Sequence, residues 1–288
     1  MNTRNMTIIR LNLIALLLLI TCTSNGFSQE ATPPKSYVYK QTEQGDLSLY
    51  VYTPAQPKEK QPAIIFFFGG GWTNGKVTQF EPQARHFADR GLIAICADYR
   101  VKSRHNVTPD ECVEDAKSAI RWIRQNAGVL RVDPDRIVGS GGSAGAHLAA
   151  CTGICDGLDA KQDDLTISSR PNALVLYNPV LDLTDTKFRQ RLQSKEKLAE
   201  AISPALNLKS DSPPTLLLFG SKDPLLEQAE AFTARSRQIG HRAEIDITPD
   251  EGHGFFNRPP WLEKTTQRAD QFLVSLGYLP LTPTDSQK

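Results

Sequence analysis

Short runs of continuously apolar residues alternate along this chain with longer amphipathic runs, and this alternation restricts the fold more than any other feature. The clearest apolar runs are AIIFFF (63–68), LIAICA (92–97), ALVLY (173–177) and TLLLFG (215–220). A strand that is apolar at every position is typical of a sheet buried on both faces. Helical patterns fill the intervals, at about 79–90, 108–127, 144–153, 225–239 and 261–276. The pattern therefore predicts an α/β fold with a mostly parallel sheet and helices on both faces.

Turn and capping residues place the limits of individual elements. Thr108 suits the N-cap of a helix, Pro109 suits its first turn, and Gly128 lies just beyond its expected end. Two β-rich runs, SYVYK (36–40) and LSLYVYTP (47–54), predict an antiparallel pair of strands before the alternating part. Together these patterns predict about eight strands.

The N-terminus has the pattern of an export signal. Arg4 and Arg10 precede an apolar run at 11–20, and small polar residues follow it. We predict a signal peptide at 1–28 that is cleaved after Ser28. Cys22 leaves lipidation open as an alternative, and an uncleaved anchor is a third. The apolar run is too short to cross a bilayer comfortably, which takes about 20 residues, so we expect a secreted or periplasmic protein without a stable membrane span.

The remaining chain fits one large domain. We divide it into an N-terminal segment with the first strands (29–62), a catalytic core (63–279) and a flexible tail (280–288). Within the core, the charged stretch 182–212 is longer than an ordinary connection. It predicts a short cap over the strand ends.

Charge and cysteine content exclude several classes of partner. The formal net charge is +1 and no basic block is present, so we expect no nucleic-acid partner. Cys96, Cys112, Cys151 and Cys155 would remain after cleavage, and export would permit them to form disulfides whose pairing the sequence leaves open. Their spacing does not match a zinc site. We favour buried free thiols and expect no metal ion or cofactor.

A glycine-rich turn at 136–150 surrounds one serine with small residues. Gly139, Gly141 and Ala144 fit the dinucleotide pattern G-x-G-x-x-G/A. A dinucleotide fold also needs a second strand that ends in an acid about 20 residues later, and no strand precedes the acids found there. The alternative is G-x-S-x-G, in which a sharp strand-to-helix turn exposes Ser143 as a nucleophile. We favour the nucleophile.

A serine nucleophile needs a histidine base and an orienting acid. His253 follows the last predicted strand and is flanked by glycines, which places it at the carboxyl edge of the sheet beside the serine. His241 precedes that strand and belongs at the opposite edge. We expect His147, one helical turn after the serine, to be a packing residue. His86 and His105 precede the serine and do not fit the order serine, acid, histidine.

The acid and the oxyanion donors are expected at the same edge. Asp223 follows the strand TLLLFG, and Asp182, which follows an earlier strand, is the alternative acid. Backbone N–H groups that stabilise an oxyanion come from the residue after the nucleophile and from a loop after an earlier strand. These criteria select Ala144 and the glycine loop with Gly70 and Gly71.

Five motifs in order resemble the α/β-hydrolase esterases and lipases related to hormone-sensitive lipase. They are FGGGW (68–72), DYR (98–100), GSGGSAGAHLA (139–149), GSKDPLL (220–226) and EGHGFF (251–256). The resemblance implies an α/β-hydrolase fold and a serine esterase that needs no cofactor. It implies a catalytic triad of Ser143, Asp223 and His253 and an oxyanion hole formed by Gly70, Gly71 and Ala144.

The chain departs from that group at two positions. Phe68 stands where the group usually has a histidine, and Gly142 replaces the usual acid before the serine. These departures leave the substrate open. Short acyl esters, of small molecules or of polysaccharides, are the expected substrates. The alternatives are a serine peptidase of the same fold and a binding protein with an inactive hydrolase fold.

The predicted export signal can be tested on the native protein. We expect mass spectrometry to find a mature N-terminus at Gln29. An acylated N-terminal Cys22 would instead establish the lipoprotein alternative. Detection of Met1 on the mature protein would contradict both.

Overall fold

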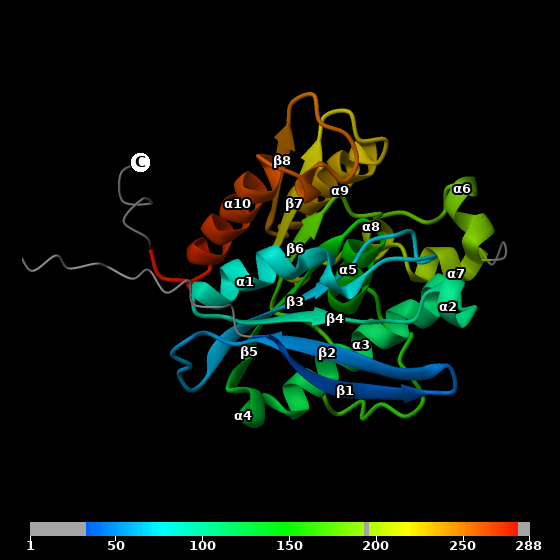
Figure 1. Cartoon of the computed structure of the whole chain (residues 1–288). Helices are drawn as coiled ribbons and strands as arrows, with labels where there is room; N and C mark the ends of the chain where they lie inside the picture. The colour runs from blue at the N-terminus through cyan, green and yellow to red at the C-terminus, as the bar shows by residue number, and fades with distance from the viewer. Residues whose placement is uncertain (1–32, 193–195, 282–288) are drawn as a thin grey trace, which may run out of the picture. The chain divides into compact units, whose positions relative to one another are not determined.

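The computed structural model describes residues 33–192 and 196–281. The predicted signal peptide, Cys22 and all but the first two residues of the predicted tail lie outside the described residues. The described part is built on an eight-stranded sheet with the order β1-β2-β4-β3-β5-β6-β7-β8 (Figure 1).

The sheet is parallel except at its first edge. Its strands are β1 (Lys35–Thr42), β2 (Gly45–Tyr52), β3 (Gln61–Phe67), β4 (Ile93–Ala97), β5 (Val132–Gly142), β6 (Ala173–Tyr177), β7 (Thr215–Gly220) and β8 (Ala243–Thr248). β2 pairs antiparallel with β1 and with β4, and all other neighbouring strands are parallel. This arrangement confirms the predicted mostly parallel sheet with an antiparallel pair at its start.

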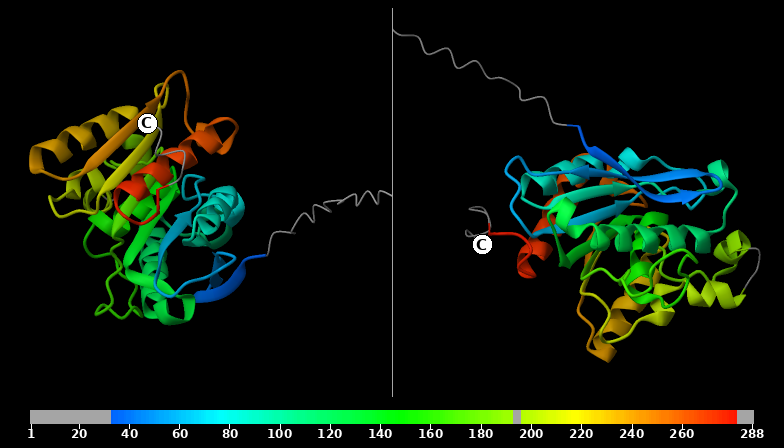
Figure 2. Two further views of the ribbon diagram at one scale, coloured as in Figure 1. Left: turned by 90° about the vertical axis from the view of Figure 1, so that its left-hand side faces the viewer. Right: turned by 90° about the horizontal axis from the view of Figure 1, so that it is seen from below.

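Helices cover both faces of the sheet (Figure 2). The long helices are α1 (Glu81–Asp89), α3 (Pro109–Gln125), α5 (Ala144–Ile154), α9 (Leu226–Ile239) and α10 (Trp261–Ser275). On β3, Ile64 and Phe66 belong to one core, which they share with α1 and α10. Ile65 and Phe67 belong to the other core, which they share with α3, α5 and α9. Alternate side chains of the strand therefore face two separate apolar layers, which explains why the run is apolar throughout.

Helix α3 begins as predicted and ends before Gly128, and a separate short helix follows it. Thr108 and Glu111 form a capping box in which the Glu111 carboxylate accepts a hydrogen bond from the Thr108 backbone N–H at 2.9 Å. Gly128 lies beyond the end of α3, as predicted, and belongs to a separate helical turn, α4 (Ala127–Leu130). Buried Leu130 packs into the core, and Arg131 then ends the turn with a left-handed φ of 58°.

The predicted cap at 182–212 contains only short helices in its described part. They are α6 (Thr186–Arg189), the 3-10 helix η2 (Gln190–Leu192), α7 (Glu196–Ala201) and α8 (Pro204–Asn207). The remaining short helices of the described chain are α2 (Lys102–His105) and the 3-10 helices η1 (Val77–Phe80) and η3 (Phe255–Asn257). The Phe188 ring of α6 lies 6.2 Å from the ring of Trp72, edge to face, so the cap reaches the loop that follows β3.

The four cysteines of the described chain are free and buried. None of the helices found between residues 33 and 281, leaving out 193–195, is both long and apolar enough to cross a membrane.

A buried ion cluster ties the antiparallel edge to the rest of the fold. The carboxylate of Asp115 on α3 accepts hydrogen bonds from Lys40 Nζ of β1 at 2.7 Å and from Arg100 Nε at 2.8 Å. The side chains of Asp115 and Lys40 are 0% and 4% exposed. Breaking such a cluster leaves a buried charge without its partner, which costs far more than breaking a surface pair.

We therefore expect Asp115→Asn to lower the free energy of unfolding by about 3 kcal/mol or more. The matched control is Asp156→Asn, because the Asp156–Lys209 pair has side chains that are 86% and 56% exposed, and its loss should cost less than about 1 kcal/mol. Urea unfolding of both variants measures the difference. Equal costs would show that the buried cluster contributes nothing beyond a surface ion pair.

Candidate active site

Ser143 occupies a strained turn between β5 and α5. Its backbone has φ 52° and ψ −116°, in a left-handed region that residues with a Cβ rarely adopt. A Cβ on Gly145 would lie 2.0 Å from the carbonyl oxygen of Phe67, and a Cβ on Gly141 would lie 2.4 Å from the same atom. The two glycines of G-x-S-x-G are therefore required because β3 passes so close to the turn.

The structure brings the three predicted triad residues into one hydrogen-bonded relay. The Ser143 hydroxyl lies 2.8 Å from Nε2 of His253, and Nδ1 of the same ring lies 2.9 Å from Oδ2 of Asp223. The Asp223 carboxylate accepts from Nδ1–H, which leaves Nε2 free to accept the serine proton. The Asp223 side chain is fully buried, whereas that of His253 is 36% exposed. His253 therefore stands at the surface of the site, and Asp223 lies beneath it.

Two further donors hold the acid. The Asn178 side-chain amide donates to Asp223 Oδ2 at 2.5 Å, and the backbone N–H of Leu225 donates to Oδ1 at 2.9 Å. Asn178 follows β6, is fully buried and has a left-handed φ of 48°. Our sequence reasoning missed Asn178. The signal available in the sequence was a lone amide directly after an apolar strand and before Pro179.

The alternative acid is not brought to the relay. Asp182 Oδ1 accepts hydrogen bonds from the backbone N–H of Thr184 at 2.8 Å and from its hydroxyl at 2.7 Å. The Ser203 hydroxyl lies 3.4 Å from the same oxygen. These contacts hold the Asp182 carboxylate within the cap instead of at the relay.

The other four histidines are engaged elsewhere. His147 is fully buried between Trp72 and Ile202, and burial lowers its pKa to about 4, so the ring is neutral near pH 7. His241 contacts Ser236 and the Pro213 carbonyl near the amino end of β7. His86 contacts the Asp270 carboxylate, and Nδ1 of His105 accepts a hydrogen bond from the Val101 N–H.

The glycine loop after β3 runs beside Ser143. A Cβ on Gly69 would lie 2.8 Å from the Gly142 carbonyl oxygen and 3.5 Å from Cβ of Ser143. Gly70 and Gly71 have positive φ values of 129° and 61°, which glycine adopts without steric cost. The loop can therefore present backbone N–H groups at the serine, opposite Ala144 at the start of α5.

Both departures from the expected motif are filled by aromatic packing. The Phe68 ring stacks on Tyr99 with 4.1 Å between the ring centroids, and the Tyr99 hydroxyl donates to the Phe68 carbonyl at 2.7 Å. A Cβ on Gly142 would lie 2.6 Å from the Phe256 ring and 3.1 Å from the Phe80 ring. The two rings leave no room at position 142 for the side chain that the resemblance would suggest, and at position 68 the phenyl ring packs where the histidine would stand.

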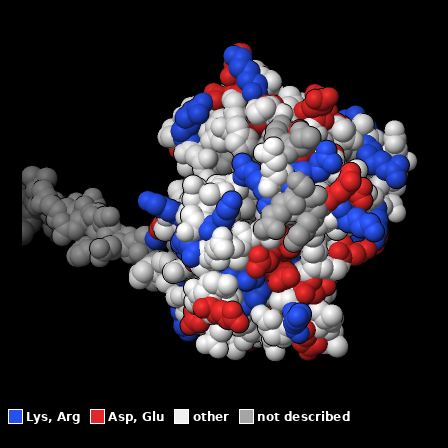
Figure 3. Space-filling model, turned by 90° about the vertical axis from the view of Figure 1, so that its right-hand side faces the viewer, with Lys and Arg blue, Asp and Glu red and all other residues white. Residues whose placement is uncertain are grey.

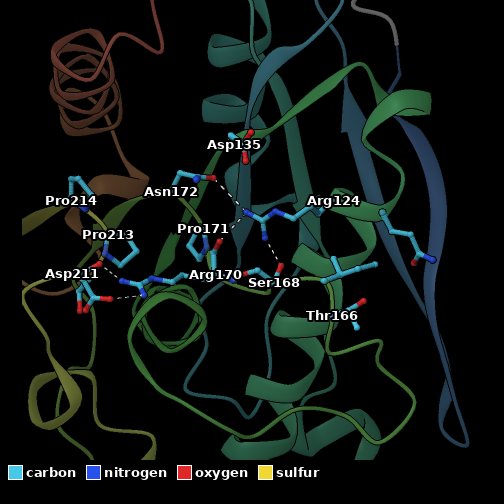
Figure 4. Close-up of a pocket in the computed structure, with 13 residues that line it drawn as sticks. Arg124, Asp135, Thr166, Ser168, Arg170, Pro171, Asn172, Asp211, Pro213 and Pro214 are labelled. Atoms are coloured by element: carbon cyan, nitrogen blue, oxygen red, sulfur yellow. Dashed lines mark hydrogen bonds and ion pairs between the residues drawn. The ribbon is translucent and has the colours of Figure 1, made fainter.

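A polar cavity of about 690 Å³ lies at the other end of the sheet. Pro171 and Pro213, which line it, precede β6 and β7, whereas the relay follows the strands. Figure 4 shows Arg124 directed at the carbonyl of Ser168 and Arg170 directed at Asp211, so both guanidinium groups are occupied within the fold. In the described part of the chain no group of three His, Cys, Asp or Glu side chains could hold a metal ion.

Sequence comparisons identify relatives among esterases. The model of the BD-FAE family matches residues 49–236. Esterase LipQ of Mycobacterium tuberculosis is 34% identical over 202 residues, which cover 64% of this chain and 48% of LipQ. Carboxylesterase NlhH of the same species is 25% identical over 231 residues, 74% of this chain and 72% of NlhH. The match thus spans about half the length of LipQ and most of NlhH.

Solved structures give a fuller match. The apo form of esterase 2 from Thermogutta terrifontis is 43% identical, with a TM-score of 0.84, over 89% of this chain and 99% of that chain. Fold, motif order and relatives agree. The chain belongs to the BD-FAE family, within the α/β-hydrolase esterases of the group related to hormone-sensitive lipase.

Proposed function

We propose that this protein hydrolyses short-chain carboxylic esters through an acyl-enzyme formed on Ser143. The observation that carries the proposal is the unbroken relay from Ser143 to His253 and Asp223, with contacts of 2.8 and 2.9 Å. A serine hydroxyl becomes a nucleophile when such a base accepts its proton.

The reaction has two halves. In the first, His253 Nε2 takes the hydroxyl proton while Ser143 Oγ bonds to the ester carbonyl carbon. The tetrahedral intermediate then expels the alcohol, which receives the proton from His253. In the second half, His253 takes a proton from water, and the water oxygen attacks the carbonyl carbon of the acyl-enzyme. The proton then passes to Ser143 Oγ as the carboxylic acid product is released, which restores the serine hydroxyl.

Backbone groups stabilise the negative charge on the carbonyl oxygen. The N–H groups of Gly70 and Gly71 act from the loop after β3, and the N–H of Ala144 acts from the first turn of α5. The positive end of the helix dipole adds to this field. Donors that are already in place when the charge forms contribute strongly to the rate.

The substrate proposal draws on relatives and on the surface. Thermogutta terrifontis esterase 2, at 44% and 43% identity, has been solved with propionate bound and with butyrate bound, which supports a short acyl group. Figure 3 shows basic and acidic side chains interspersed on the face that carries α6 and α7, as suits an uncharged ester. The predicted signal peptide supports action outside the cytoplasm, where acylated polysaccharides are accessible.

Covalent labelling tests the nucleophile. The Thermogutta esterase, at 44% identity, has been solved phosphorylated by paraoxon, and we expect paraoxon to inactivate this protein by modifying Ser143. Ser143→Ala should prevent labelling and lower turnover of 4-nitrophenyl butyrate by about a thousandfold or more. Peptide mass spectrometry locates the adduct.

The control for this experiment is a second serine close in sequence. Ser140 on β5 is fully buried and donates to the Val175 carbonyl, so Ser140→Ala should still be labelled. A Ser143→Ala protein with activity within tenfold of wild type would refute the mechanism. Esters of graded acyl length, acetylated xylan and peptide amides, compared on wild type, separate the small-ester, polysaccharide and peptidase alternatives.

The two candidate acids are separated by matched substitutions. Asp223→Asn should lower turnover by about a hundredfold to ten-thousandfold, because the amide cannot stabilise the imidazolium formed during attack. Asp182→Asn should cost less than about tenfold, because that carboxylate holds a turn of the cap. Both variants are assayed on one small ester after circular dichroism shows that they are folded. The reverse ranking would move the acid to the loop after β6.

A further inference from the structure

Trp72 follows the two oxyanion glycines directly and is held on several sides. Its side chain is buried, with the residue 3% exposed. Its backbone has a left-handed φ of 59°, and its carbonyl accepts a hydrogen bond from the Lys102 N–H at 2.9 Å. A bulky residue persists in this conformation only when its surroundings enforce it.

His147 connects Trp72 to the nucleophile helix and to the cap. The indole Nε1–H of Trp72 donates to His147 Nδ1 at 3.2 Å, and His147 Nε2–H donates to the Ile202 carbonyl at 2.7 Å. The backbone N–H of His147 donates to the Ser143 carbonyl at 3.0 Å. One buried imidazole therefore spans the oxyanion loop, the first turn of α5 and the end of α7.

The two hydrogen bonds require a neutral ring with its proton on Nε2. The Ile202 carbonyl can only accept, so Nε2 must donate. Nδ1 is then the acceptor for the indole N–H. Burial lowers the pKa of His147 to about 4, which preserves this neutral tautomer at neutral pH.

Arg191 of the cap contacts the same loop from the solvent side. Its Nη1 donates to the Gly71 carbonyl at 2.5 Å, and its guanidinium lies 5.5 Å from the centre of the Trp72 ring. The Gly71 carbonyl belongs to the peptide plane that joins Gly71 to Trp72. Arg191 therefore restrains the peptide that follows the oxyanion glycines.

We infer that Trp72, His147 and Arg191 are positioning residues that hold the oxyanion loop in its working geometry, with the cap as part of the support. This inference rests on the proposed ester hydrolysis. Two adjacent glycines supply the required backbone conformation but no rigidity of their own. Since oxyanion donors act by being in place before the charge forms, the rigidity has to come from the anchored residue beside them.

The effect of a loosened loop should appear in the transition state. An oxyanion interacts with the loop amides more strongly than the neutral ester does, so kcat should fall while KM stays nearly constant. A displacement of about 1 Å at a catalytic group can cost about a hundredfold in rate. A role in packing alone would lower stability without this separation of kcat from KM.

The main test is Trp72→Phe, which keeps a ring and removes the N–H donor. We expect kcat on 4-nitrophenyl butyrate to fall by about tenfold to a hundredfold, with KM within about twofold. The affinity for butylboronic acid, which forms a tetrahedral adduct on the serine, should fall in parallel with kcat. The matched control is Trp122→Phe on α3, whose ring packs on Tyr37, and it should leave both constants unchanged.

Two further variants test the same contact from its other partners. His147→Phe removes the acceptor, and the double variant with Trp72→Phe should lose little more kcat than either single variant, because all three lack the same hydrogen bond. Arg191→Met removes an exposed donor and should lower kcat by about threefold to tenfold at constant KM. Because its side chain is exposed, it decides the matter if Trp72→Phe does not fold.

The outcomes separate this inference from the proposed function. Unchanged kcat in the folded variants, or a rise in KM at constant kcat, overturns the positioning role. If paraoxon still labels Ser143 of the wild-type protein in that case, the proposed esterase function stands. A wild-type protein that is neither labelled nor active removes the proposed function, and the inference with it.

Discussion

The close approach of β3 to the serine turn is the contact on which the rest of the site depends. A Cβ at Gly145 or Gly141 would lie 2.0 or 2.4 Å from the Phe67 carbonyl, so only glycine permits β3 and β5 to pair right up to the turn. Because parallel neighbours end at the same edge, the loop that leaves β3 emerges beside Ser143. One backbone contact thus places Ser143 and a glycine loop next to each other.

How much of the structure could be predicted from the sequence depends on how far apart along the chain the interacting residues lie. The hydrophobic period of each segment and the order of the motifs can be read from short stretches of sequence. The buried strands, the serine turn and the positions of the predicted acid and base therefore follow from them. Asp182 and Asp223 both follow apolar strands, so position along the chain does not separate them, and it is the motif GSKDPLL that favours Asp223. The difference lies in the partners Thr184 and Asn178, and the second of these is 45 residues away from Asp223.

The two departures from the family pattern have one physical explanation. Phe68 and Gly142 replace a histidine and an acid, and at each position an aromatic ring takes the available space. The groups assigned to the oxyanion are backbone N–H groups, which every residue but proline supplies. Side chains beside them can therefore be exchanged as long as the backbone path is kept, and stacked rings such as Phe68 on Tyr99 stabilise that path.

The cap, although short, joins the two sides of the site. On one side, Gln228 of α9 binds the start of the cap: its Oε1 accepts from the N–H of Leu181 at 2.9 Å and its Nε2 donates to the Asp182 carbonyl at 3.1 Å. Helix α9 begins just after Asp223, so this is the side of the acid. On the other side, the Ile202 carbonyl accepts a hydrogen bond from His147 of α5, and Arg191 donates to Gly71 in the loop that follows β3. A segment of short helices thereby connects the loop of the acid to the loop of the oxyanion, which lie four strands apart along the chain and on opposite sides of β5 and β6 in the sheet.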